Sequence, residues 1–218
     1  MDFLNPYTKY RLFPDNVPRV EGATGGLLQK SPIVCGGNYS RNTLNITKDC
    51  AVIGQPEMEM KMIDKRRGAA SVALDESTLW IVGGFDGKFY PRSTELIKLD
   101  QPSGKGPFLP NRIFPIVGHS MIQYDEKSSY IIGGYQNGAL SKKTWIVNPT
   151  NGFKITEGPS LKKPRSNHGC AKMTINGRTI LVVAGGFGAQ ESGGYGALDS
   201  VEILDPLGNN VWTQGLYI

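Results

Sequence analysis

Four apolar runs along the chain each end in a pair of glycines, at 33–37, 79–84, 130–134 and 181–186. The first glycines of successive pairs are 47, 50 and 52 residues apart. A period near fifty residues indicates that one structural unit is repeated four times. Because the runs are continuously apolar rather than alternating, each predicts a short strand that is buried on both faces.

Each of these strands, named b, is flanked by segments that predict three more strands. Strand a is predicted at 22–28, 69–74, 119–124 and 168–175, strand c at 49–53, 94–99, 144–147 and 200–204, and strand d at 58–63, near 105–109, at 153–156 and at 211–214. Turn-forming residues join c to d at 148–152 and 205–209. Four short strands with tight turns predict a four-stranded antiparallel sheet, and stacking such sheets around an axis covers faces that no single sheet can cover.

The expected fold is therefore an all-β propeller of four four-stranded antiparallel blades, with the ring open or partial. The predicted blades span 20–64, 65–113, 114–161 and 162–218, and 1–19 is interpreted as an N-terminal extension or the tail of a preceding blade. The eight paired glycines are interpreted as structural, since glycine accepts a positive φ and lets a neighbouring backbone approach closely.

The units resemble those of the kelch-repeat family. That resemblance rests on an apolar strand ending in Gly-Gly, then a strand with Glu or an aromatic residue, and a Trp near the end of the unit, as in Gly185-Gly186, Glu202 and Trp212. Arg67 and Arg165 resemble the Arg that starts strand a in the family, whereas the third unit has Ile116 there. Kelch rings usually hold five to seven blades, so the resemblance implies a segment of a longer propeller or an open arc.

Charge and hydropathy argue against two classes of partner. The 24 basic and 19 acidic residues give a net charge of +5, and the basic residues are scattered in short groups. We expect no nucleic-acid partner, because such proteins gather basic residues on one face. We expect no membrane span, since no apolar run approaches the ~18–20 residues that a membrane helix needs.

The loops between strands b and c, and those between d and the next a, emerge at one end of a propeller and carry the predicted binding surface. Tyr and Arg dominate the hot spots of protein interfaces, and aromatic residues, Arg and Gln presented together suit a peptide or protein partner. A protein or peptide partner is therefore expected there. The candidate partner-binding residues are Phe85, Tyr90, Arg92, Tyr135, Gln136, Phe187 and Tyr195 from b–c loops, and Arg67, Arg112 and Arg165 from the d–a side. An alternative role for the three d–a arginines is to bond carbonyl groups between blades.

The favoured function is a non-catalytic scaffold for protein–protein interaction. Some kelch-type propellers are enzymes, including a copper oxidase and a sialic acid isomerase, so a propeller enzyme or a carbohydrate-binding domain is one alternative. The substrate-binding part of a ubiquitin-ligase adaptor is another, although the BTB and BACK domains of such adaptors are not in this sequence. No Gly-x-Ser-x-Gly turn is present, and the residues of the copper site do not map onto two histidines.

No cofactor or metal site is predicted. The two histidines, His119 and His168, occupy the same position of their units, and no HxH, HxxxH or CxxC spacing accompanies them. We interpret them as structural residues that are hydrogen-bonded across blades.

Cys35 and Cys50 fall on strands b and c of the first unit, and neighbouring antiparallel strands bring two cysteines within disulfide reach. Two sequons, at Asn38 and Asn45, lie between them. Together these features resemble a Cys-containing group of secreted invertebrate kelch proteins and favour an extracellular location if the N-terminus is incomplete; otherwise a cytoplasmic one is expected. Buried free cysteines and chance sequons are the alternative interpretation.

Overall fold

The computed structural model is an all-β protein, described for residues 20–39, 44–55, 57–99, 101, 104–107, 109, 113, 116–191 and 193–215. These residues form six antiparallel sheets of three or four strands, none of which closes on itself. Within the same residues there is no helix, so none is long and apolar enough to cross a membrane.

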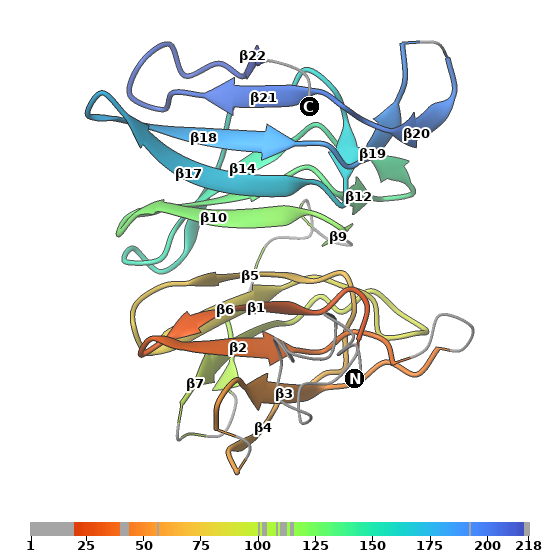
Figure 1. Cartoon of the computed structure of the whole chain (residues 1–218), viewed down its shortest axis with the longest axis vertical. Helices are drawn as coiled ribbons and strands as arrows, with labels where there is room; N and C mark the ends of the chain where they lie inside the picture. The colour runs from red at the N-terminus through yellow and green to blue at the C-terminus, as the bar shows by residue number, and fades with distance from the viewer. Residues whose placement is uncertain are drawn as a thin grey trace, which may run out of the picture.

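Four large sheets follow one another along the chain, and in each the strands hydrogen-bond in chain order apart from short insertions (Figure 1). The first contains β1 (Thr24–Leu28), β2 (Ser31–Cys35), β3 (Asp49–Val52) and β4 (Glu59–Lys61). The second contains β5 (Ala70–Ala73), β6 (Thr78–Val82), β7 (Thr94–Lys98) and β8 (Gly104–Lys105). The third contains β10 (Ser120–Asp125), β11 (Ser128–Ile132), β14 (Thr144–Asn148) and β15 (Lys154–Glu157), and the fourth β17 (Gly169–Ile175), β18 (Arg178–Ala184), β21 (Val201–Leu204) and β22 (Thr213–Gln214).

The first strands of the four sheets lie next to one another in chain order: β1 contacts β5, β5 contacts β10, and β10 contacts β17. Figure 1 shows the same succession from the red sheet to the blue one. The sheets span 24–61, 70–105, 120–157 and 169–214, so each lies inside one of the units expected from the sequence.

Two small sheets were not expected from the sequence. One contains β9 (Ile116–Val117), β12 (Tyr135–Gln136) and β13 (Ala139–Leu140), and the other β16 (Arg165–Ser166), β19 (Phe187–Ala189) and β20 (Tyr195–Ala197). The b–c segments of the third and fourth units are therefore short hairpins rather than irregular loops.

Three apolar clusters fill the spaces between consecutive large sheets. The first holds Leu79 and Ile97 together with Ile33 of β2, the second is built around Trp80 and Trp145, and the third around Leu181 and Trp212. The three tryptophans are at most 2% exposed. Since burial of a large apolar side chain is worth roughly 1.5–3 kcal/mol, packing between sheets is the main source of stability.

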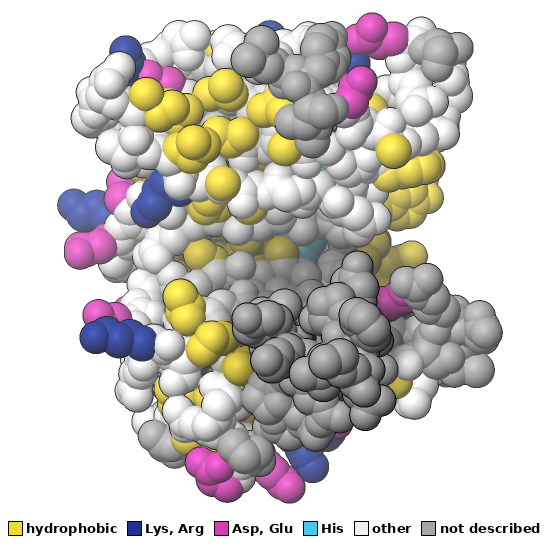
Figure 2. Space-filling model, viewed as in Figure 1, with side chains coloured by type: hydrophobic (Ala, Val, Ile, Leu, Met, Phe, Trp, Pro, Cys, Tyr) yellow, Lys and Arg dark blue, Asp and Glu magenta, His cyan; other side chains and the backbone are white. Residues whose placement is uncertain are grey.

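The b strands differ in burial according to their place in the stack. All five residues of β6 are buried, because the second sheet has a neighbour on each face. In β18 only Leu181 and Val183 are buried, and Val182 between them is half-buried. Figure 2 shows hydrophobic side chains, in yellow, on the surface of this fourth sheet in the upper half of the view.

The paired glycines form the joints between units, which confirms their structural interpretation. All eight have a positive φ, from 61° to 96°. In the first three units the N–H of the second glycine donates to a carbonyl in the segment leading into the next sheet, as in the 2.9 Å bond from Gly84 to Ile116. A Cβ on Gly134 would lie 2.8 Å from the Cβ of His119, so the close approach requires glycine.

Candidate binding surface

At one end of the large sheets, the segment leading into each strand a pairs with the residues that follow the glycine pair. The four pairings are Glu21 with Asn38, Arg67 with Phe85, Val117 with Tyr135, and Ser166 with Phe187. This end therefore carries the b–c and d–a segments of all four units, as the sequence predicted for a binding surface.

A run of backbone hydrogen bonds joins the four lead-in segments. The N–H of Gly68 donates to the carbonyl of Gly22 at 2.8 Å, that of Gly118 to Gly68 at 2.8 Å, and that of Asn167 to Gly118 at 2.6 Å. All four residues have a positive φ, which glycine tolerates and asparagine accepts more readily than most residues. The bonds hold the lead-in segments of sheets that are far apart in sequence around one point.

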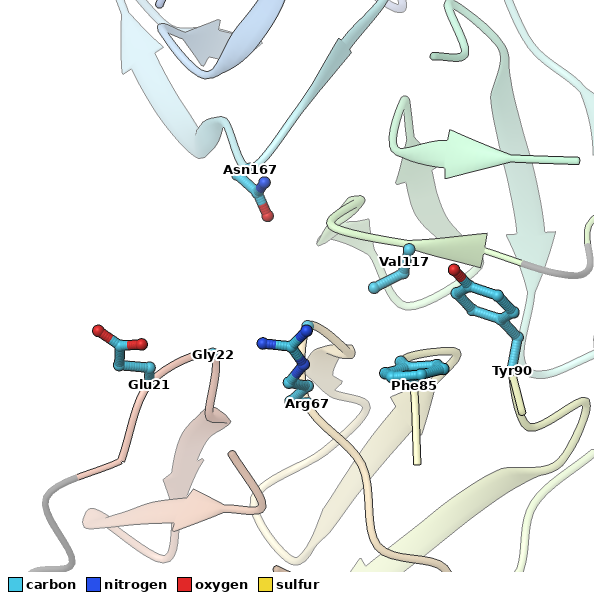
Figure 3. Close-up of a pocket in the computed structure, with 8 residues that line it drawn as sticks. Glu21, Gly22, Arg67, Phe85, Tyr90, Val117 and Asn167 are labelled. Atoms are coloured by element: carbon cyan, nitrogen blue, oxygen red, sulfur yellow. The ribbon is translucent and has the colours of Figure 1, made fainter. Parts of the chain in front are cut away.

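A cavity of about 310 Å³ opens at this point (Figure 3). Figure 3 shows the side chain of Arg67 directed into the space between Glu21, Val117 and Asn167. The lining residues come from all four units, and they are Glu21, Gly22, Arg67, Gly68, Phe85, Tyr90, Val117 and Asn167. The predicted binding residues Arg67, Phe85 and Tyr90 are thus brought together in one cavity.

Arg67 is the cation of this cavity. Its guanidinium carbon lies 5.8 Å from the centroid of Phe85, and the rings of Phe85 and Tyr90 are 5.0 Å apart. In the part of the chain that the structure describes, no carboxylate forms an ion pair with Arg67. A guanidinium held against an aromatic ring without an acidic partner is suited to bind an anionic or carbonyl group.

The loop after Phe85 is ordered by Asp86. Its carboxylate accepts the N–H of Phe89 at 2.6 Å and that of Lys88 at 2.7 Å. The bond from Phe89 holds the pKa of Asp86 below its usual value, so the turn keeps its acceptor charged at neutral pH. Phe89 and Tyr90 are presented to solvent by this turn, at 60% and 41% exposed.

A second cavity, of about 470 Å³, lies between the two small sheets at the same end. It brings together three more of the predicted residues, Tyr135, Phe187 and Tyr195, which are 41%, 45% and 68% exposed. The complete lining is Tyr135, Gly138, Ala139, Leu140, Pro164, Ser166, Phe187 and Tyr195.

Arg165 does not belong to the binding surface, which corrects the expectation from the sequence. Its side chain is fully buried and forms an ion pair with Glu202 at 2.9 Å, and it donates to the carbonyls of Gly185 and Ser200, each at 2.9 Å. Arg165 therefore bonds carbonyls in the interior of its own unit, and not carbonyls between blades, which was the alternative role expected for it.

In the second unit the same role belongs to Arg66 and not to Arg67. Arg66 is buried, pairs with Glu95 at 2.5 Å and donates to the carbonyl of Gly83 at 2.7 Å. Each buried glutamate also accepts two backbone N–H groups from the segment before its arginine: Glu95 from Ile63 and Asp64, Glu202 from Lys162 and Lys163.

A signal in the sequence could have identified these pairs. The position of the buried glutamate is occupied by Trp145 in the third unit, and the position of the buried arginine by Ile116. Both side chains pack in the apolar cluster between the second and third sheets. The buried arginine and the buried glutamate thus occur together in a unit or are both replaced. This is expected, because a buried charge without its partner lowers the stability of the fold.

Gln136 is also corrected: it is 9% exposed, and its amide donates to the carbonyl of Ile113 at 2.7 Å. It anchors the hairpin rather than facing a partner. Arg92 is exposed, as expected for a contact residue. Arg112 lies outside the described residues.

The two histidines are buried at the starts of β10 and β17. His168 Nε2 lies 2.8 Å from the hydroxyl of Ser120 in the preceding sheet, which fits the expected bond across units. For His119 that expectation is corrected, since neither ring nitrogen has a hydrogen-bond partner among the described residues. Burial lowers the pKa of His119 to about 3, and burial with the nearby Arg165 charge lowers that of His168 to about 4, so both are neutral at pH 7. Among the described residues, no group of three or more His, Cys, Asp or Glu side chains is placed to hold a metal ion.

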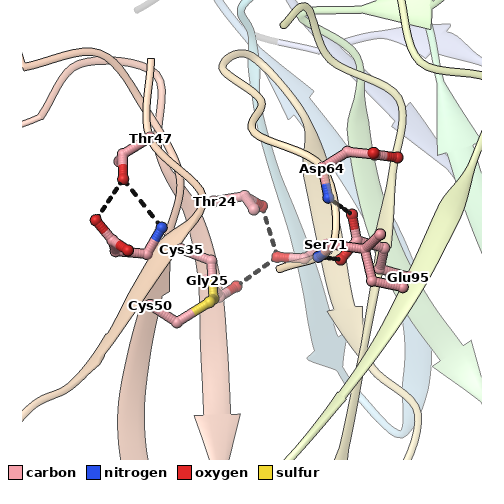
Figure 4. Close-up of a disulfide and its surroundings, with 10 residues drawn as sticks. Thr24, Gly25, Cys35, Thr47, Cys50, Asp64, Ser71 and Glu95 are labelled. Carbon is pink, nitrogen blue, oxygen red and sulfur yellow. Dashed lines mark hydrogen bonds between the residues drawn. A yellow bond between two sulfur atoms is a disulfide. The ribbon is translucent and has the colours of Figure 1, made fainter. Parts of the chain in front are cut away.

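Cys35 and Cys50 form a disulfide between β2 and β3 (Figure 4), which confirms that pairing. The two are direct cross-strand partners with Cα atoms 4.0 Å apart. Beside it, the Ser71 hydroxyl donates to the carbonyl of Gly25 at 2.8 Å and so links the second sheet to the first.

The two sequons differ in exposure. Asn38 is 3% exposed and pairs with both Glu21 and Ile46, so a glycan on its side chain is incompatible with this fold. That candidate is corrected. Asn45 is exposed, and its glycosylation stays a prediction.

No family model matches the chain, and no curated protein matches it. Among solved structures, the structure of YjhT is similar, with a TM-score of 0.71 at 12% sequence identity. The match covers 91% of this chain and 71% of that chain. At this identity the similarity concerns the fold alone.

Proposed function

We propose that the four large sheets are blades of a kelch-type β-propeller, and that the chain is a non-catalytic scaffold that binds another protein through its b–c and d–a segments. The repeated a–b–c–d order, the contacts between successive first strands and the packing of apolar clusters between the sheets support the propeller.

The observation that carries the binding function is the convergence of six predicted residues on two cavities at one end. Arg67, Phe85 and Tyr90 line the first cavity, and Tyr135, Phe187 and Tyr195 line the second. These residues are separated by up to 128 positions in the sequence, and no apolar core requires them, since they are half-buried or exposed.

Their chemistry supports a protein partner. Tyrosine and arginine provide a large share of the binding energy in protein interfaces, because each combines an apolar body with a polar group. Two cavities of about 310 and 470 Å³ can each take side chains of a partner, and the exposed Phe89 and Arg92 lie in the loop that follows Phe85.

The test replaces Tyr135 and Arg92 together by alanine and compares protein capture from a native extract with that of the unmodified chain. A matched control replaces Leu207 and Lys127, an apolar and a basic exposed residue in turns at the opposite end of the sheets. We expect proteins captured by the unmodified chain to fall about tenfold or more with the Tyr135/Arg92 variant and to stay unchanged with the control.

Melting curves decide whether the effect is one of binding. Both variants should melt within about 1–2 °C of the unmodified chain, because exposed positions seldom change stability by more than about 0.5 kcal/mol. Equal capture by both variants, or a large fall in melting temperature for Tyr135/Arg92 alone, would contradict the assignment.

A further inference from the structure

The second cavity has a distinct composition. It lies between the hairpin β12–β13 and the small sheet β16–β19–β20, and three of its eight lining residues are aromatic. The rings of Phe187 and Tyr195 are stacked, with centroids 6.3 Å apart and an angle of 18° between their planes. Tyr135 is fixed from the other side, since its hydroxyl donates to the carbonyl of Gly138 at 2.7 Å.

The polar groups of the cavity are few and are mainly hydroxyls. Its described lining contains no Asp, Glu, Asn, Gln, Lys or Arg side chain. No hydrogen bond of the Tyr195 or Ser166 side-chain hydroxyl is found within the described residues, so both can donate to a ligand. The cavity therefore offers apolar ring faces together with hydroxyl donors, and it offers no charge.

This composition disfavours two classes of ligand. A charged side chain would lose its hydration here without gaining a partner of opposite sign. A sugar would bring many hydroxyl groups, and most would be left unpaired in a cavity without carboxylate or amide side chains.

We propose that this cavity binds a proline-rich segment of the partner in the polyproline II conformation. Proline rings are apolar and pack on aromatic rings, and a run of prolines has backbone carbonyl acceptors but no N–H donors. Its carbonyls match the free hydroxyls of Tyr195 and Ser166. Because the polyproline II helix is already extended in solution, little conformational entropy is lost on binding, which suits a small contact area.

The proposal deepens the proposed function, on which it rests, by naming the chemistry of the bound segment. The cavity volume of about 470 Å³ lies in the range of ~300–1,000 Å³ found for ligand sites. The segments on both sides, β12–β13 and β19–β20, are hairpins tied to the lead-ins by backbone pairing, so the aromatic groups have fixed positions before the ligand arrives.

The test uses a fluorescein-labelled decaproline peptide as the probe and measures its dissociation constant for the purified chain by fluorescence anisotropy. A labelled Gly-Ser decamer of equal length and a labelled neutral tetrasaccharide are measured in parallel. We expect saturable binding of decaproline and none of the other two up to millimolar concentration of the protein.

Three variants locate the site. Tyr195→Ala and Phe187→Ala should each raise the dissociation constant about tenfold or more, since they remove a stacked ring. Tyr195→Phe keeps the ring and should raise it roughly two- to tenfold through loss of one hydrogen bond. Leu207→Ala is the control, an exposed apolar residue at the opposite end of the sheets that should leave the constant unchanged.

Absence of decaproline binding, equal affinity of the Tyr195→Ala and Leu207→Ala proteins, or saturable binding of the tetrasaccharide at this cavity would each overturn the proposal. The proposed function is judged separately. If decaproline does not bind while capture of proteins still depends on Tyr135 and Arg92, the proposed scaffold function stands and the bound segment has another chemistry. If decaproline binds while capture is independent of Tyr135 and Arg92, the cavity binds proline-rich peptides and the proposed scaffold surface is wrong.

Discussion

At the scale of single residues, the arginines show how a one-position difference changes a role. Arg66 is buried and paired with Glu95, whereas its neighbour Arg67 faces a cavity beside Phe85. The resemblance to kelch units matched Arg67, and not Arg66, to the arginine that starts strand a, because the two arginines are adjacent in the sequence. The roles of Arg66 and Arg67 differ only because their side chains lie differently relative to β7, and packing between sheets sets that position.

The buried pair Arg165–Glu202 leads to a prediction on stability. Arg165→Leu leaves the buried Glu202 without its partner and should lower the free energy of unfolding by about 3–5 kcal/mol. The double variant Arg165→Leu/Glu202→Leu should recover most of that loss, as the natural Ile116 and Trp145 of the third unit suggest. Urea unfolding curves measure both. A single variant as stable as the unmodified chain would show that the pair contributes nothing.

The histidines lead to a prediction on pH. Their pKa values in the fold, about 3 and about 4, lie below the ordinary value of 6.5. The unfolded chain therefore binds protons that the fold excludes, and this contribution to stability is complete above pH 6.5 and is lost as the pH falls below it. Each histidine should cost about 1.4 kcal/mol per pH unit below 6.5 until its folded pKa is reached.

Proton NMR tests this directly, because the chain contains only two histidines and their ring signals can be followed separately. Neither signal should titrate between pH 7 and 5, while the urea midpoint falls over that range. A ring that titrates near pH 6.5 would mean that it is solvated in the folded protein.

At the scale of elements, the disulfide stabilises the pair β2–β3, which borders the first core cluster. Cys35 and Cys50 are 1% and 6% exposed, separated by 15 positions in the sequence. In the register of the sheets Cys50 occupies the position of Thr94, Thr144 and Val201 in the other units, and Ala51 occupies that of the buried glutamates, so the disulfide lies beside the glutamate position and not at it.

Removal of this bond should be measurable. Reduction, or the variant Cys35→Ala/Cys50→Ala, should lower the free energy of unfolding by about 3 kcal/mol, the value expected for a closed loop of about 15 residues. Under native, non-reducing conditions, mass measurement after alkylation should show at most one modified thiol, that of the partly buried Cys170. Three modified thiols would remove the disulfide.

The strands of the four large sheets could be predicted from the sequence, and those of the two small sheets could not. The b strands are apolar over their whole length and end at glycine pairs, so β6 and β11 occur where expected. By contrast, β9, β12 and β13 contain two residues each. A pattern of two residues has no period, and these strands form only because the lead-in segments are brought beside the b–c segments.

At the scale of the molecule, the described sheets form a stack whose outer sheets lack one neighbour. The fourth sheet leaves Met173, Ile175 and Val211 between 43% and 49% exposed, as an unpacked sheet face does. The second and third sheets, which have neighbours on both sides, hold the most completely buried b strands.

These faces predict that the isolated chain associates with itself. We expect the apparent mass in static light scattering to rise with protein concentration, and to do so less in the variant Met173→Lys/Ile175→Lys, because two charges on the exposed face oppose apolar contact. The association should persist at high salt, since apolar burial drives it. A monomer at all concentrations, in low and high salt, would contradict this expectation.

The sequence by itself determined the all-β class, the order of strands in the four large antiparallel sheets, the role of the glycine pairs and the residue types at the loop-bearing end. These follow from local periodicity and from the steric freedom of glycine, which depend on neighbouring residues only. The tertiary structure decided that Arg67 faces a cavity while Arg165 is buried, that Gln136 is an anchor, and that Tyr135 lies with Phe187 and Tyr195 around one cavity. Those outcomes depend on which side chains from different sheets come within contact distance, and no local pattern encodes that distance.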